Sequence, residues 1–230
     1  MNKIKSLWLA LTRFERILWI TSLIVVTLSY LLTPSENWMT LVASLIGVTA
    51  LIFVAKGYVI GQVLCVVFAV FYGVVSLRFC YYGEVITYLG MSAPIAVVST
   101  VSWLRHPYRK TAEVEVVHLS PKKVALLSCA TVVVTTAFYF ILAALNTTNL
   151  AWSTASIATS FFAASLTAMR SPYYALAYIA NDLVLIVMWI LASIENIAYL
   201  PMIFCFVMFM ANDLYGFWNW RRMRRRQERE

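Results

Sequence analysis

The sequence predicts an all-α integral membrane protein with eight transmembrane helices, and three observations lead to this fold class. Hydrophobic residues make up 62% of the 230 residues and charged residues only 12%, with a mean hydropathy of +0.80. The apolar residues form long runs, and the basic residues fall between these runs. A soluble domain has roughly 25% charged residues, so this chain lacks the side chains to cover an aqueous surface. Soluble enzymes and nucleic-acid-binding modules are therefore excluded.

A helix that spans a bilayer needs about 20 largely apolar residues, and eight runs approach or reach this length. None of them alternates polar and apolar residues in the period of two that a β-barrel strand requires, so each is predicted to be a helix. In chain order the predicted spans are Ile17–Leu32, Trp38–Ala55, Tyr58–Cys80, Glu84–Leu104, Val124–Leu145, Asn149–Met169, Tyr173–Ser193 and Tyr199–Trp220.

The first span is the shortest, and a basic stretch with apolar residues precedes it. Residues 1–37 are therefore predicted to form an interfacial amphipathic segment followed by one extra transmembrane helix. A cleaved signal peptide would also combine a basic start with an apolar run. No small residues in the spacing of a cleavage site precede Thr33, so we expect this segment to stay in the mature protein.

The other seven spans predict an internal repeat. Residues 38–104 and 149–220 each contain three spans joined by tight loops, and a long basic cytoplasmic loop with a linker helix, 105–148, lies between them. Because the linker helix adds one crossing, both three-helix bundles start on the same side of the membrane. This 3+1+3 arrangement is a parallel repeat, a transporter plan in which the substrate binds near the midplane between the repeats. A basic cytoplasmic tail, 221–230, follows.

The distribution of basic residues predicts the orientation. When the loops are assigned alternately to two sides, every lysine and arginine except Arg78 falls on the side of both termini. The positive-inside rule then places both termini in the cytoplasm. The net charge of +8 is thus explained by orientation and contact with the lipid bilayer, and no nucleic-acid partner is expected.

Two carboxylates and their asparagine neighbours are the candidate centre of a substrate site. The only aspartates, Asp182 and Asp213, lie inside apolar spans, and each directly follows an asparagine, Asn181 or Asn212. Such groups are costly at membrane depth and usually face a cavity or a partner. The corresponding polar residue of the first bundle is Gln62, which can donate and accept hydrogen bonds. The alternative is that all five only bond helices together.

Aromatic residues on the last two spans are candidates for stacking on a substrate. We expect Tyr174, Tyr178 and Trp218 to line the site, since Tyr178 lies one turn before Asp182 on the same helix face. An aromatic ring beside a carboxylate suits a flat, positively charged ring, and Asp182 is the candidate counter-charge. Pro94 interrupts the fourth span, where a proline bends a helix, and is a candidate gating residue.

No pattern in the sequence indicates catalysis. His106 and His118 both fall in the long basic loop, and the four cysteines show no C-x-x-C spacing. We expect no catalytic residues, no metal site and no cofactor, because no phosphate loop or nucleophile motif occurs. A membrane-embedded lipid-modifying enzyme with Asp182 and Asp213 as metal ligands is the distant alternative.

Several motifs resemble those of the PnuC vitamin transporters. They cover both three-helix bundles and are YVIGQ at 58–62, YGE at 82–84, SWLR at 102–105, YALAYIAND at 174–182 and NDLYGFWNW at 212–220. The resemblance implies a fold related to the SWEET sugar carriers. It also implies facilitated diffusion of nicotinamide riboside, with alternating access and trapping by a cytosolic kinase. By this similarity the substrate would contact Gln62, Asn181, Asn212 and Asp213.

One departure from the family pattern leaves the vitamin open. The family pattern W-x-x-W-x-x-x-N ahead of the seventh-span asparagine is here Tyr174, Ala177 and Asn181. Thiamine, riboflavin or a deoxyribonucleoside are therefore alternative small-molecule substrates, and proton-coupled transport is an alternative mechanism. The sequence leaves homo-oligomerisation open as well.

Overall fold

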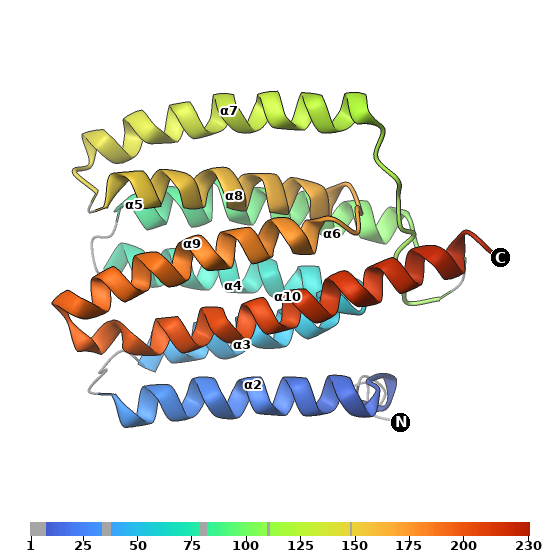
Figure 1. The fold of residues 1–230 in the computed structure, drawn as a ribbon, viewed down its shortest axis with the longest axis horizontal. Coiled ribbons are helices and arrows are strands. Elements are labelled where there is room, and N and C mark those ends of the chain that lie inside the picture. Colours follow the sequence, from blue (N-terminus) through green and yellow to red (C-terminus); the bar gives the residue numbers. More distant parts are fainter. Residues whose placement is uncertain (1–7, 34–37, 79–81, 110, 148) are drawn as a thin grey trace.

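The structure, a computed structural model, describes residues 8–33, 38–78, 82–109, 111–147 and 149–230. In these ranges the regular elements are helices, accompanied by two isolated β-bridges. Figure 1 shows the long helices stacked side by side in one bundle. The elements are α2 (Arg13–Leu32), α3 (Trp38–Ala55), α4 (Val59–Arg78), α5 (Tyr82–Val85), the π-helix η1 (Ile86–Ser92), α6 (Ala93–Arg105), α7 (Pro121–Ala144), α8 (Leu150–Ala168), α9 (Tyr174–Glu195), the 3-10 helix η2 (Ile197–Tyr199) and α10 (Leu200–Gln227).

The predicted all-α membrane fold is confirmed. Within the described ranges, six helical stretches are long and apolar enough to cross a membrane: Arg13–Leu32, Trp38–Ala55, Gly83–Arg105, Pro121–Ala144, Tyr174–Glu195 and Ile197–Gln227. The other two predicted spans correspond to α4, whose apolar part is shorter, and α8, which is rich in serine and threonine. The count of eight spans therefore stays a prediction. The start of the predicted amphipathic segment, 1–7, and Cys80 lie outside the described residues.

The beginning of α2 is fixed by a capping box. The Thr12 N–H donates to the Glu15 carboxylate at 2.5 Å, and the Glu15 N–H donates to the Thr12 hydroxyl at 3.3 Å. The same carboxylate, buried at 1% exposure, accepts from the Lys56 ammonium at 2.8 Å and from the Tyr215 hydroxyl at 2.7 Å. These bonds connect α2 to the turn after α3 and to α10. Helices α3 and α10 are the two against which α2 packs.

The bundle has two distinct ends. In Figure 1, α2 and α7 form the two outer layers, and the other helices lie between them. The beginning of α2 and the end of α10 lie at the same end, which we call the terminal end; the opposite end is the distal end. The turns after α3 and after α8 also lie at the terminal end, whereas the connection from α7 to α8 lies at the distal end.

The segment 106–119 joins both halves of the chain at the terminal end. Its Val114 N–H donates to the Gly57 carbonyl at 2.9 Å, and its Val117 N–H donates to the Arg170 carbonyl at 3.0 Å. Gly57 and Arg170 are the left-handed residues that end the turns after α3 and α8, with φ of 74° and 59°. The side chain of Gln227, near the end of α10, bonds the backbone of the same segment twice. This segment therefore spans the turns of both predicted bundles.

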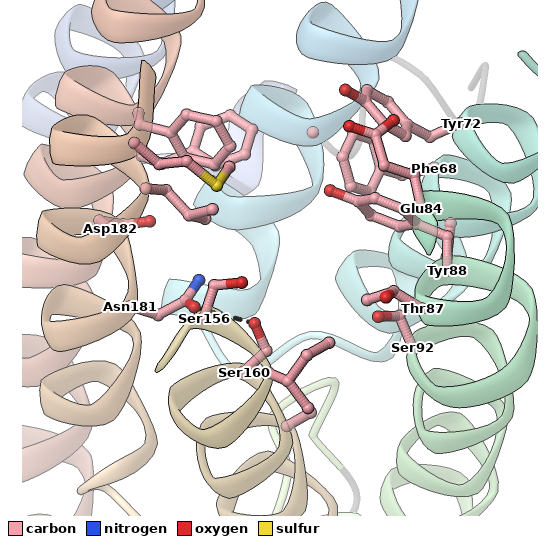
Figure 2. Close-up of a pocket in the computed structure, with 18 of the residues that line it drawn as sticks. Phe68, Tyr72, Glu84, Thr87, Tyr88, Ser92, Ser156, Ser160, Asn181 and Asp182 are labelled. Carbon is pink, nitrogen blue, oxygen red and sulfur yellow. Dashed lines mark hydrogen bonds between the residues drawn. The ribbon is translucent and has the colours of Figure 1, made fainter. Parts of the chain in front are cut away.

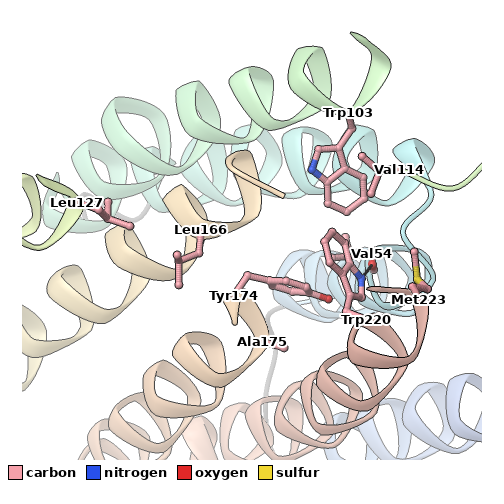
Figure 3. Close-up of a cluster of buried hydrophobic side chains, with 9 residues drawn as sticks. All are labelled: Val54, Trp103, Val114, Leu127, Leu166, Tyr174, Ala175, Trp220 and Met223. Atoms are coloured by element: carbon pink, nitrogen blue, oxygen red, sulfur yellow. Dashed lines mark hydrogen bonds between the residues drawn. The ribbon is translucent and has the colours of Figure 1, made fainter. Parts of the chain in front are cut away.

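A fully buried aromatic plug, Trp103, Tyr174 and Trp220, fills the terminal end below this segment. The ring centroids of Trp103 and Trp220 are 5.3 Å apart, and those of Tyr174 and Trp220 are 4.9 Å apart. Figure 3 shows the two indoles facing each other from α6 and α10, with Val54 beside them. Close packing of this kind leaves no path for a solute.

Trp103 and Trp220 make what we call exchanged hydrogen bonds, in which each indole N–H donates to a helix of the other predicted bundle. The Trp103 indole N–H, from the end of α6, donates to the Thr167 carbonyl in the last turn of α8 at 3.0 Å. The Trp220 indole N–H, from α10, donates to the Val54 carbonyl in the last turn of α3 at 2.9 Å. Each predicted bundle thus places one tryptophan against the first helix of the other bundle.

Candidate functional site

A cavity of about 600 Å³ lies in the interior of the bundle, on the distal side of the aromatic plug. Helices α3, α4, α5, η1 and α6 supply one part of its lining, α8, α9 and α10 supply another, and the end of α7 also contributes. The lining continues to exposed residues at the distal end, among them Asn146, Asn149 and Glu195. At the terminal end it stops at Val54 and Thr167, the two residues whose carbonyls the plug tryptophans bond. The cavity is therefore accessible from the distal end and closed at the terminal end.

The floor of the cavity is polar. Gln62 of α4, Asp182 of α9 and Asp213 of α10 line it, and each is only 2–3% exposed. The carboxyl groups of Asp182 and Asp213 lie close enough to interact electrostatically. Tyr178 lines the cavity beside them, as its position one turn before Asp182 predicts.

Asn181 is held in one orientation by α8. Its amide oxygen accepts from the hydroxyls of Thr159 at 2.9 Å and Ser160 at 2.8 Å. With the oxygen engaged, the amide nitrogen is the group that can donate to a ligand. Figure 2 shows Asn181 and Asp182 on one wall of the cavity, with Ser156 and Ser160 near them. These serines were not among the predicted site residues, although the many hydroxyl residues in the sequence of α8 could have indicated a polar helix face.

The opposite wall consists of aromatic residues and one carboxylate that the sequence analysis did not select. Figure 2 shows Phe68, Tyr72, Glu84 and Tyr88 facing Asn181 and Asp182 across the cavity. Tyr72 and Tyr88 have ring centroids 4.5 Å apart. In the sequence Glu84 stands at the start of a span, where a carboxylate is ordinarily solvated, so its direction could not be predicted.

Three predicted site residues do not line the cavity. Tyr174 belongs to the aromatic plug and is fully buried there. The Asn212 amide donates to the Ser22 hydroxyl of α2 at 3.1 Å and to the Met208 carbonyl at 2.7 Å, so it joins α10 to α2. Trp218 is 57% exposed on the outer surface, with the guanidinium of a neighbouring arginine over its ring. These three residues could not be distinguished in the sequence from the residues that line the cavity, because the membrane spans of α9 and α10 are apolar on every side.

Pro94 lies just after the π-helix η1, in the first turn of α6. A proline cannot donate a backbone hydrogen bond, and the turn before it closes by a bond from the Ala93 N–H to the Tyr88 carbonyl, five residues back. Instead of a simple bend, the helix has a widened turn at this point. Pro94 itself is not among the residues that line the cavity, but Ser92 and Ala96 on either side of it are.

Comparisons with known proteins agree with this architecture. A family model described as nicotinamide mononucleotide transporter matches residues 37–222. The nicotinamide riboside transporter PnuC of Neisseria mucosa is 25% identical over 220 residues, which are 94% of this chain and 83% of that protein. The crystal structure of the vitamin B3 transporter PnuC matches with a TM-score of 0.79 and 25% identity, covering 95% of this chain and 94% of the other.

These matches confirm the resemblance on which the sequence analysis relied. The family model spans both predicted three-helix bundles, and the structural match includes nearly the whole chain. A helical bundle with an interior cavity and several membrane-crossing helices is what a carrier requires. The chain therefore belongs to the nicotinamide mononucleotide transporter family, that of the PnuC proteins, and is a multi-pass membrane transporter.

Proposed function

We propose that the protein carries nicotinamide riboside across the bacterial inner membrane by facilitated diffusion, and that a cytosolic kinase then traps the substrate by phosphorylation. The observation that carries this proposal is the polar floor and wall of the cavity, formed by Gln62, Asn181, Asp182 and Asp213 inside apolar helices. The relative is a nicotinamide riboside transporter and the matching structure is that of a vitamin B3 transporter, which supports the same vitamin.

The chemistry of the floor and wall suits a nucleoside-like ligand. The amides of Gln62 and Asn181 can bond ribose hydroxyls or a carboxamide, and the paired carboxyls accept from hydroxyl groups. Tyr178 adds an aromatic surface at the floor. A cavity of about 600 Å³ is within the range of sites for small molecules. We assign Gln62, Tyr178, Asn181, Asp182 and Asp213 to the substrate site.

A parallel repeat is the proposed basis of alternating access. The turn after α3 is closed by a bond from the Tyr58 N–H to the Phe53 carbonyl at 2.9 Å, and the turn after α8 by the same bond from Ser171 to Leu166 at 3.0 Å. These pairs are related by one constant offset in the sequence. The acceptors of the two exchanged tryptophan bonds, Val54 and Thr167, keep the same offset. Two halves built alike can rock about a site between them.

The orientation of the structure follows from its charges. Lys56, Arg105, Arg170 and the basic end of α10 lie at the terminal end, which we therefore place in the cytoplasm, with both chain termini. The cavity then opens outward, and the aromatic plug is the closed inner gate. Transport requires the plug tryptophans to separate while the distal end closes.

The substrate is tested by a binding screen on the purified protein. We expect nicotinamide riboside to raise the melting temperature and to give a calorimetric binding isotherm, because a ligand that binds only the folded state stabilises it, by about 2.7 kcal/mol at a hundred times Kd. Thiamine, riboflavin and deoxyribonucleosides are expected to give no such shift. Binding of one of these and not of nicotinamide riboside would overturn the proposed substrate.

Proton-coupled transport is the second candidate, and the neighbouring carboxyl groups of Asp182 and Asp213 favour it, because two interacting carboxyl groups can bind and release a proton. The test is uptake of labelled substrate into proteoliposomes under a pH gradient, with the membrane potential clamped to zero. For facilitated diffusion we expect uptake to stop at equal concentrations inside and outside. Accumulation beyond that level, lost in Asp213→Asn, would instead establish proton coupling.

A further inference from the structure

Five rings form an aromatic wall along the cavity: Phe68, Tyr72, Tyr88, Phe206 and Phe209. Their ring centroids are connected by short steps, 4.5 Å between Tyr72 and Tyr88, 5.8 Å between Phe68 and Tyr72, and 6.4 Å between Phe68 and Phe209. These distances are typical of interacting aromatic pairs. The wall therefore presents a continuous set of ring faces and edges to the cavity.

Glu84 adds a carboxyl group at the edge of this wall. Its carboxylate lines the cavity, is half-buried, and interacts electrostatically with both Tyr72 and Tyr88. Figure 2 places it beside these rings and across the cavity from Asn181. Ring faces carry partial negative charge, so rings and carboxylate together attract a cation and disfavour an anionic ligand.

The π-helix η1 directly follows Glu84 and brings further residues to the same cavity. Glu84 precedes the widened turn, and Tyr88 lies within it. Thr87 and Ser92, which are five residues apart, both line the cavity. In a π-helical turn residues five apart fall on the same side, whereas in an α-helix this spacing turns one of them away. Widened turns of this kind are frequent at functional sites.

We propose that Glu84 and the aromatic wall seat the positively charged aromatic ring of the substrate, an N-substituted pyridinium, while the polar floor binds its hydroxyl groups. This assignment rests on the proposed function and deepens it. It differs from the expectation that Asp182 supplies the counter-charge. Asp182 lies at the floor beside Asp213, whereas Glu84 lies against the rings on which a flat cation stacks.

The test compares two forms of one ligand, nicotinamide riboside with its cationic ring and the reduced dihydronicotinamide riboside with a neutral ring. We expect Glu84→Gln to weaken calorimetric binding of the cationic form about tenfold and to leave binding of the neutral form unchanged. The matched control is Glu195→Gln, which removes an exposed carboxylate at the distal mouth of the same cavity. In that control we expect both affinities to stay within about twofold of the original protein.

Each other outcome has a definite meaning. Equal loss of both forms in Glu84→Gln would make Glu84 a structural residue and overturn the assignment. A loss confined to the cationic form in Asp182→Asn, with Glu84→Gln unchanged, would return the counter-charge to the floor. Failure of the unmodified protein to bind either form would instead contradict the proposed function.

Discussion

Replacing Asn181 by alanine is expected to lower the affinity for nicotinamide riboside about a hundredfold while the protein stays folded. The amide of Asn181 is held by Thr159 and Ser160 with its nitrogen available to the cavity. Its removal leaves a polar group of the bound substrate without its protein partner, at a cost of about 2–3 kcal/mol. Calorimetry on the purified variant measures the loss, and uptake into proteoliposomes should fall in parallel.

The matched control is Asn196→Ala. Asn196 caps η2 at the distal end by accepting from the Ala198 N–H, is exposed and does not line the cavity. We expect its affinity for substrate to be unchanged. The Thr159 hydroxyl keeps its bond to the Ala155 carbonyl in the Asn181 variant, so the melting temperature should change little. An Asn181→Ala protein that is strongly destabilised but binds normally once folded would make this residue an interhelical bond only.

The second large effect is expected at the inner gate. In the double variant Trp103→Phe/Trp220→Phe, a phenyl ring replaces each indole. The plug stays aromatic, but both exchanged hydrogen bonds are lost. At about 1 kcal/mol for each bond, the population opened at the terminal end should rise about thirtyfold. Cys65 lines the cavity and serves as the reporter. Its modification by a polar thiol reagent added at the terminal side, located by mass spectrometry, should accelerate by the same factor.

Trp218→Phe is the control for this experiment. Trp218 lies two residues before Trp220 on α10 but is exposed and takes no part in the plug. We expect this variant to leave the modification rate of Cys65 unchanged. The single variants Trp103→Phe and Trp220→Phe should have similar effects, because their bonds are equivalent in the two halves. A lower melting temperature without faster modification would show that the tryptophans only pack the bundle.

The sequence alone determined the class of the protein and the location of its costly polar residues. Long apolar runs permit only helices in a bilayer, because backbone groups there must bond within their own segment. The same energetic argument identified Asp182, Asp213, Asn181 and Gln62, since a polar side chain at membrane depth must find a cavity or a partner. All four line the cavity in the structure. The motifs that resembled the PnuC family led to the family that the comparisons confirm.

Only the tertiary structure decided which helix face each polar or aromatic residue occupies. In an apolar helix surrounded by lipid and other helices, periodicity does not distinguish the face toward a cavity from the face toward a neighbour. Asn212 therefore looked equivalent to Asn181 in the sequence, yet it bonds Ser22 of α2. Glu84, at the start of a span, could not be distinguished in the sequence from a solvated carboxylate, yet it lines the cavity. The polar floor of the site could thus be predicted from the sequence, whereas its aromatic wall is visible only in the packing of the helices.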